Sequence, residues 1–276
     1  VHAGSTIKKV DGFVGAFGTT IEKEGCREAL DHGVTIIASG ASELKPEGQY
    51  LYGTDDRVIT GLELQARLAR RDESLDKVET VVFIQCVGSR IPERPYCSKL
   101  CCAQSIRSAL ELKENKPETE VFIVYRDMRP YGLREDLYRE ARQKGIRFLR
   151  YNFDKGLDVT NEKGCLEVSF TDFVLRRKMV LSPDMLVLAA AIVREKNDPL
   201  AGFFKVTQND DGFYVEAHLK LRPVDFATDG VFLCGLAHGP KPVDESIAQA
   251  QAAAARAVTL LSAGSIPVSG TVAQVN

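Results

Sequence analysis

The sequence predicts an α/β protein in which a βαβαβ unit with a parallel sheet interrupts a first domain. Three strands of buried composition, Thr80–Ile84, Glu120–Tyr125 and Gly145–Arg150, alternate with two helical segments at the spacing of βαβ units. After residue 182 the chain again shows buried strands of the kind found before residue 77. A chain of 276 residues with 44% hydrophobic and 27% charged residues is long enough and apolar enough for this arrangement.

The first part, residues 1–76, opens with short alternating segments broken by glycines. These segments, Thr6–Val10, Phe13–Phe17 and Thr19–Ile21, predict a small antiparallel meander over residues 1–33. The apolar run Val34–Ala41 predicts a buried strand that ends in small residues, where a backbone can approach a ligand closely. Helical spacing of leucine and isoleucine predicts a helix over Val58–Arg70.

The inserted part, residues 77–182, carries the βαβαβ pattern. Its expected elements, in order, are a strand, a helix, a strand, a helix and a strand at Lys77–Val87, Ala103–Asn115, Glu120–Tyr125, Arg134–Gln143 and Gly145–Arg150. Two further strands, Leu166–Phe170 and Phe173–Met179, predict a hairpin or meander extension.

The last part, residues 183–262, is expected to complete the first domain. Met185–Ala190 and Val231–Gly235 are predicted buried strands, and an alanine-rich helix is predicted over Asp244–Leu261. Residues 263–276 are expected to be a linker or tail. Because the chain opens with Val1 rather than methionine, we expect a piece of a longer polypeptide.

Composition and charge argue against several classes of function. The formal net charge of −2 and the pI of about 6.2 give no electrostatic footprint for nucleic acid. No apolar run reaches the roughly 18 residues that a transmembrane helix needs, and there is no leader pattern at the start. We therefore expect a cytoplasmic protein without a transmembrane segment.

Four of the seven cysteines are clustered. Cys86, Cys97, Cys101 and Cys102 fall within 17 positions after a predicted strand, where four thiolates could surround one metal centre. A zinc site, a redox dithiol and coincidence are the alternatives, although the paired Cys-x-x-Cys knuckles typical of zinc are absent. An odd cysteine count without a loop-rich pattern argues against a secreted disulfide scaffold.

Other residues are interpreted from their types and places. Cysteine is a common small core residue, and this is the interpretation for Cys26, Cys165 and Cys234. Three arginines at predicted strand ends beside the cysteine turn are expected to interact near a cofactor, namely Arg90, Arg126 and Arg129.

At these residues the chain resembles a known family. The segments Gln85–Arg90, Tyr96–Ser98 and Cys101–Cys102 are similar to the cysteine signature of the A subunits of heterodisulfide reductases and their relatives. The resemblance extends from about residue 34 to 262, and it is supported by three further segments, Tyr125–Arg129, Leu219–Val224 and Gly235–Ala250.

The resemblance implies a fold, cofactors and partners. It implies a split FAD-binding domain of the thioredoxin-reductase type with an inserted nicotinamide-domain-like βαβαβ unit. It implies a non-standard [4Fe-4S] cluster on Cys86, Cys97, Cys101 and Cys102, FAD in the split domain, and other redox subunits of a heterodisulfide-reductase-like complex. A homodimer is one further assembly that fits this expectation.

The expected FAD contacts lie at two strand ends and one helix start. Backbone N–H groups at a helix start favour the partial negative charge of a reduced flavin edge or of phosphate. The candidate cofactor-binding residues are Gly40, Gly235, Leu236, Ala237, His238, Lys241, Pro242, Val243, Glu245 and Ser246.

Three departures from the family pattern qualify these expectations. No G-x-G-x-x-G is present, so FAD is expected to bind weakly, or not at all, unless another chain supplies the part that holds its pyrophosphate. The Cys86–Arg90 segment stands where a nicotinamide-binding enzyme carries its glycine fingerprint, which argues against direct NAD(P)H use. Arg107 stands where bifurcating relatives tend to have lysine, and it is included among the candidate cofactor-binding residues.

The leading hypothesis is an oxidoreductase subunit that moves electrons between FAD and a [4Fe-4S] cluster and on to partner subunits. One alternative is a flavin-less docking or structural module with a four-cysteine metal site. The other is a pyridine-nucleotide disulfide reductase that uses Cys101 or Cys102 as a redox thiol.

Overall fold

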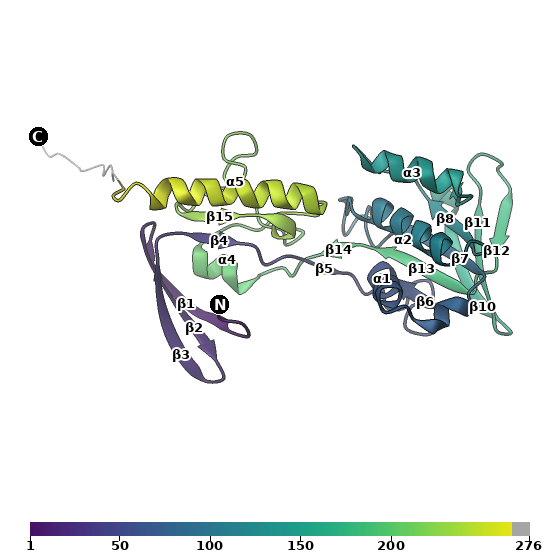
Figure 1. The fold of residues 1–276 in the computed structure, drawn as a ribbon, viewed down its shortest axis with the longest axis horizontal. Coiled ribbons are helices and arrows are strands. Elements are labelled where there is room, and N and C mark those ends of the chain that lie inside the picture. The colour runs from purple at the N-terminus through teal and green to yellow at the C-terminus, as the bar shows by residue number, and fades with distance from the viewer. Residues whose placement is uncertain (267–276) are drawn as a thin grey trace, which may run out of the picture. The chain divides into compact units, whose positions relative to one another are not determined.

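The computed structural model describes residues 1–266 and divides them into two compact units (Figure 1). The inserted unit is Ser42–Val193. The split unit consists of Val1–Ala41 together with the described residues from Arg194 to 266.

A parallel sheet of five strands forms the centre of the inserted unit. Its spatial order is β6 (Val58–Thr60), β13 (Met185–Ala190), β7 (Thr80–Val87), β8 (Glu120–Tyr125) and β9 (Arg147–Arg150). All six residues of β13 are buried, because this strand has a partner on each side and a covering layer on each face. Hence the apolar run at 185–190 is continuous rather than alternating.

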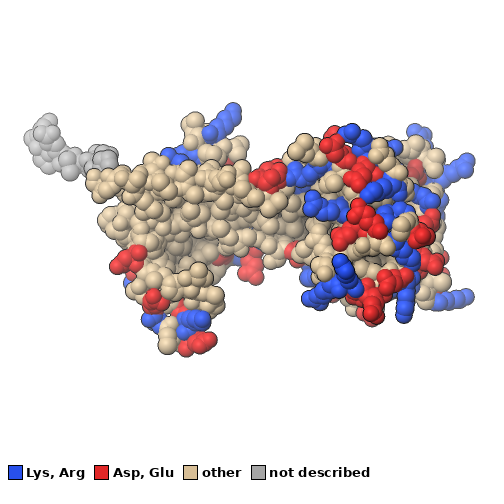
Figure 2. All heavy atoms as spheres, in the orientation of Figure 1, with Lys and Arg blue, Asp and Glu red and all other residues tan. Residues whose placement is uncertain are grey.

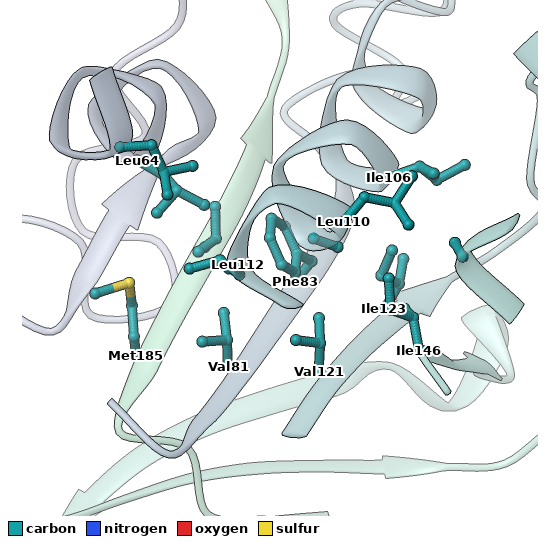
Figure 3. Close-up of a cluster of buried hydrophobic side chains, with 14 of the residues drawn as sticks. Leu64, Val81, Phe83, Ile106, Leu110, Leu112, Val121, Ile123, Ile146 and Met185 are labelled. Carbon is teal, nitrogen blue, oxygen red and sulfur yellow. The ribbon is translucent and has the colours of Figure 1, made fainter. Parts of the chain in front are cut away.

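Helices cover one face of this sheet. They are α1 (Gly61–Arg70), α2 (Cys101–Asn115) and α3 (Arg134–Gln143), and the 3-10 turn Glu73–Lys77 leads into β7. Figure 3 shows Leu64 of α1 and Ile106 of α2 packed over Phe83 and the neighbouring strand residues. Alternate strand residues point to this layer, as the twofold period of a strand requires.

An antiparallel sheet covers the opposite face. Its strands are β10 (Leu157–Glu162), β11 (Cys165–Thr171) and β12 (Lys178–Leu181), and a 3-10 turn, Phe153–Lys155, precedes it. Leu166, Val168 and Phe170 of β11 pack with Ile84 and Leu188 of the parallel sheet. The short antiparallel pair β5 (Ser42–Glu43) and β14 (Ile192–Val193) closes the unit where the chain enters and leaves it.

Two parallel strands lie at the core of the split unit. β4 (Thr35–Ile37) pairs with β15 (Val231–Leu233), and the long helix α5 (Val243–Leu261) packs on one face through Ala253 and Ala257. The other face is covered by α4 (Pro199–Phe204) and by the antiparallel meander of β1 (Thr6–Phe13), β2 (Ala16–Lys23) and β3 (Cys26–His32).

The charged side chains differ between the units. Figure 2 shows lysine, arginine, aspartate and glutamate interspersed over the visible face of the inserted unit, and few charges over the visible surface of α5. Within residues 1–266 no helix is both long enough and apolar enough to cross a bilayer.

The observed units differ from the expected division at residues 76 and 182. The inserted unit begins at Ser42, because β6 pairs in parallel with β13 and α1 packs in the same core as α2. It ends at Val193, because β13 lies between β6 and β7 rather than in the first domain. Met185–Ala190 is thus a strand, as predicted, but it belongs to the inserted unit.

Several local expectations also need correction. The helix expected at Val58 begins three residues later, where Thr60 caps it and Glu63 completes a capping box. β3 and β10 were not predicted, and Phe173–Arg177 is a turn rather than part of a strand. The 3-10 turn Gly235–Ala237 follows β15, which therefore ends at Leu233.

The interpretation of three cysteines as core residues is right for only one of them. Cys234 is buried, whereas Cys26 and Cys165 are exposed because each opens a strand directly after a tight turn. Of the expected linker, residues 267–276 lie outside the described residues.

Candidate functional site

Cys86 is placed by an irregularity in β7. Ile84 pairs with Leu188 and Val87 pairs with Ala190, so β7 holds one more residue than β13 over this interval. Gln85 keeps the helix-side position, donating to Ser105 Oγ at 2.8 Å, and Val87 keeps the opposite face. Cys86 is therefore the extra residue of a bulge, with a left-handed φ of 65°, and bulges of this kind re-aim a side chain.

The turn that carries Cys97 is tied to β14. Ser98 is fully buried, and its Oγ accepts the backbone N–H of Ile192 at 2.9 Å. The Tyr96 hydroxyl donates to the carbonyl oxygen of Ile192 at 2.8 Å. The Lys99 backbone N–H lies 3.4 Å from Cys97 Sγ. Cys97 is thus held between two anchored residues.

Cys101 and Cys102 are the first two residues of α2. Leu100 stands before them, and no side chain caps this helix end. The Cys101 thiol lies 3.7 Å from the carbonyl oxygen of Ala190, at the end of β13. Exposed N–H groups and the helix dipole favour negative charge on side chains in a first turn, which suits thiolates.

The four thiols lie in one neighbourhood at the carboxyl edge of the parallel sheet. Burial raises the pKa of Cys86 and of Cys101, and it raises the pKa of Cys102 to about 11. Cys86 and Cys97 also contribute to the raised pKa of both helix cysteines, so their sulfur atoms are close enough to interact. A raised pKa keeps the thiols of Cys86, Cys101 and Cys102 protonated and poorly nucleophilic.

The donor set fits a sulfur-ligated metal centre in kind and in location. Within residues 1–266, however, no three cysteine, histidine, aspartate or glutamate side chains already converge as a ready-made metal site. Soft metals bind thiolate and displace its proton, which matches the residue type of these four side chains.

A group of charged residues flanks the cysteines. Arg90 has a left-handed φ of 60°, and its Nη1 lies 3.8 Å from Cys86 Sγ. The same guanidinium binds both carboxylate oxygens of Asp127, in the loop after β8. Arg129 holds Asp127 from the solvent side through Nε at 3.1 Å and Nη2 at 2.9 Å. Arg126 donates to the carbonyl oxygen of Arg90 at 3.0 Å.

A second candidate site lies at the carboxyl ends of β4 and β15 in the split unit. Gly40 and Gly235 follow these two adjacent strands with φ of 73° and 71°, and open space surrounds the position of a Cβ at each. Arg194 binds the carbonyl oxygen of Gly40 and the carboxylate of Asp198, and its side chain is only 6% exposed. The two strand ends thus form an edge that Arg194 holds in place and that leaves open space beside both glycines.

The loop after β15 is closed by its own hydrogen bonds. The Gly235 N–H donates to Gln249 Oε1 at 3.0 Å, and Lys241 Nζ donates to the carbonyl oxygen of Gly235 at 2.8 Å. His238 contacts Glu216 through Nε2 at 2.8 Å and Gln249 through Nδ1 at 2.7 Å. Burial alone would raise the pKa of Glu216, but hydrogen bonds, one of them from His238, hold it below its ordinary value.

The remaining predicted residues fall into three environments. Ala237 and Pro242 are buried, while Leu236, Glu245 and Ser246 are half-buried at the loop and the first turn of α5. Val243 is 73% exposed. Arg107 belongs to the inserted unit and is exposed on α2, about one turn beyond Cys102.

Several residues that organise these sites were not among the predicted site residues. Asp127 belongs to the segment after β8, where an acidic residue between arginines signals an ion pair. Gln249 lies within the helix that was predicted over Asp244–Leu261. Its contact with Gly235 could not be predicted, because it depends on how α5 packs. No sequence pattern marks Glu216 or Arg194. Glu216 binds His238, 22 positions away, and Arg194 binds the carbonyl oxygen of Gly40, 154 positions away.

Comparison with solved structures defines the class of fold. Thioredoxin reductase from T. acidophilum superposes with a TM-score of 0.55 at 14% identity, covering 94% of this chain and 73% of that one. Thioredoxin reductase from Lactococcus lactis gives 0.55 at 13% identity, covering 94% and 75%. The chain therefore has a thioredoxin-reductase-like fold, that of a flavin-type domain with an inserted domain, as predicted.

Comparison with curated proteins shows which proteins this chain resembles in sequence. The chain is 38% identical over 260 residues to an iron-sulfur A subunit of CoB–CoM heterodisulfide reductase from Methanopyrus kandleri, covering 88% of this chain and 40% of that protein. It is 36% identical to the A subunit of the H(2):CoB-CoM heterodisulfide,ferredoxin reductase of Methanothermobacter thermautotrophicus, covering 88% and 39%. No family model matches. Over 88% of its length the chain is thus similar to heterodisulfide reductase A subunits, and it spans about two fifths of the length of these relatives.

Proposed function

We propose that this chain is part of an oxidoreductase subunit that moves electrons between FAD and a [4Fe-4S] cluster held by Cys86, Cys97, Cys101 and Cys102. The observation that carries the proposal is that Cys86, at the end of β7, and Cys101, at the start of α2 beside the end of β13, lie at the same edge of the parallel sheet, with Cys97 in the turn between them. The cofactors supply the electron chemistry, and the protein supplies ligands, position and electrostatic surroundings.

The arrangement of the helix cysteines favours a cluster over a single zinc ion. Cys101 and Cys102 are consecutive residues at the start of α2, and successive helical side chains diverge by about 100°. Such divergence suits two irons of one cluster better than one small tetrahedral ion.

The turn after β7 argues against direct use of a nicotinamide cofactor. In a dinucleotide site, a glycine there lets the pyrophosphate approach the backbone and a helix begins at once. Here a Cβ at Gly88 would lie 2.2 Å from Leu44 Cδ2, so the glycine admits a side chain of the protein itself. α2 begins only at Cys101, after the cysteine-bearing turn.

The split unit supports a flavin contact at one end only. Gly40, Gly235 and the first turn of α5 offer backbone and space for a flavin edge, while the missing glycine fingerprint leaves its pyrophosphate without a site in this sequence. The proposal therefore includes FAD held in part by residues supplied from elsewhere. It also includes other redox subunits as partners and a cytoplasmic location.

Iron and sulfide content, measured on anaerobically reconstituted chain together with its visible spectrum, tests the proposal. We expect about four irons and four sulfides per chain with broad visible absorption. Cys97→Ser should lose most of the iron. Cys165→Ser, which removes an exposed cysteine of the same unit, should retain it.

Two results would contradict the cluster. Stoichiometric zinc in place of iron would favour a structural metal site. Equal iron content in the Cys97→Ser and Cys165→Ser chains would place any iron elsewhere.

A further inference from the structure

Arg90 has a backbone conformation that non-glycine residues seldom adopt. Its backbone is left-handed, and the carbonyl oxygen of Arg90 accepts from Arg126 at 3.0 Å. Its backbone N–H donates to the carbonyl oxygen of Tyr96 at 3.1 Å. A non-glycine residue keeps such a conformation when several contacts fix it.

The guanidinium of Arg90 bridges a cysteine and a carboxylate. Nη1 is 3.8 Å from Cys86 Sγ and also binds Asp127, which Nη2 contacts at 3.3 Å. The Arg90 side chain is 17% exposed, against 48% for Arg129 on the other side of the same carboxylate. A positive charge is therefore fixed against one thiol in a poorly hydrated place, where charge interactions are screened least.

We propose that Arg90 is a positioning residue that sets the reduction potential of the cysteine site, by donating its guanidinium fork to the Cys86 sulfur and to Asp127 together. This inference rests on the proposed function. Reduction of a thiolate-ligated cluster adds one negative charge, and a fixed donor to a ligand sulfur stabilises that charge. The fork is needed because one group must reach the sulfur and the carboxylate simultaneously.

The test is a redox titration of the anaerobically reconstituted 276-residue chain. Visible and electron paramagnetic resonance spectra monitor the reduction at each potential. Iron content is measured on each sample first. Arg90→Gln should lower the equilibrium constant for one-electron reduction ~10-fold, or about 59 mV towards negative potential. Arg90→Lys should lower it by less, because lysine keeps the charge but loses the fork. Arg129→Gln, the matched control, should change it by less than ~2-fold because its side chain is exposed.

The outcomes separate this inference from the proposed function. A wild-type chain without iron overturns both. Arg90→Gln with full iron content and an unchanged potential overturns the role of Arg90 and leaves the cluster standing, as does an equal shift in Arg129→Gln. If Arg90→Gln fails to retain iron, Arg90→Lys decides: a lowered potential supports the fork, and a wild-type potential with full iron overturns it.

Discussion

The Cys101 thiol lies 3.7 Å from the carbonyl oxygen of Ala190, although 89 positions separate the two residues. Ala190 ends β13, and Cys101 begins α2, so the end of a buried inner strand of the sheet positions the start of the helix that carries the paired cysteines. Cys86 lies on the neighbouring strand β7. The cysteine turn is therefore attached to two buried strands, and its position depends on the sheet rather than on the loop.

Ser98→Ala should loosen this attachment. The change leaves the backbone N–H of Ile192 without its acceptor and removes a fully buried hydroxyl, at a cost of about 1–3 kcal/mol. Hydrogen exchange of peptides that cover residues 97–104 and 190–193 should accelerate. Ser182→Ala, at an exposed position of the same unit, should exchange like the wild type, and equal rates in both variants would refute the role of Ser98.

Leu64→Ala should destabilise the inserted unit. Leu64 is fully buried beneath α1 and packs with α2 and the parallel sheet, so the cavity and the lost burial should cost about 2–5 kcal/mol (Figure 3). Leu62→Ala removes the same atoms from the same helix at a side chain that is 49% exposed. Denaturant unfolding followed by hydrogen exchange in β7 and β13 should separate the two variants clearly. Similar midpoints would contradict the packing of α1.

The ion pair of Asp55 and Arg57 should make the inserted unit acid-sensitive. Hydrogen bonds from Arg57 hold the pKa of Asp55 at about 2, below the value of about 3.9 for an unfolded chain. Because the folded pKa is depressed, the stabilisation is complete above about pH 5 and is lost as the pH falls from about 4 towards about 2.

Asp55→Asn should therefore be less stable than wild type at pH 7, and the difference should shrink as the pH falls through this range. Unfolding midpoints at pH 7, 5, 4 and 3 measure it. Asp56→Asn changes the charge equally at an exposed neighbouring position. If the wild type is still more stable than Asp55→Asn by the same amount at pH 3, the ion pair is not the source of the difference in stability.

Arg194→Met should strongly destabilise the split unit. The guanidinium is only 6% exposed and pairs with Asp198, which is 16% exposed, so its removal leaves a carboxylate largely buried without a cation. Breaking such a pair costs about 3–5 kcal/mol. Arg194→Met combined with Asp198→Leu should recover much of the loss in thermal unfolding. A double variant as unstable as the single one would show that the contact with Gly40, rather than the pair, stabilises this edge.

Much of the fold could be predicted because individual sequence segments specify their own secondary structure. The bounds of β8, β13 and α3 agree with the sequence patterns, since a buried strand or an amphipathic helix encodes its own environment along its length. The short strands β3 and β10 escaped prediction because their exposed, polar sequences are held by pairing with a neighbour. The unit boundary at Ser42 escaped for a related reason, since it depends on the pairing of β6 with β13.

The sequence by itself determined four strands of the parallel sheet, β7, β8, β9 and β13, the helices that cover it, and the grouping of four cysteines within 17 positions, because these are properties of neighbouring residues. The cysteines as cluster ligands stay a prediction. Tertiary structure alone decided that β13 lies between β6 and β7, that a bulge re-aims Cys86, and that Arg90 reaches Asp127. Each of these features is a contact between segments far apart in the chain, and its energy exists only once the sheet has formed.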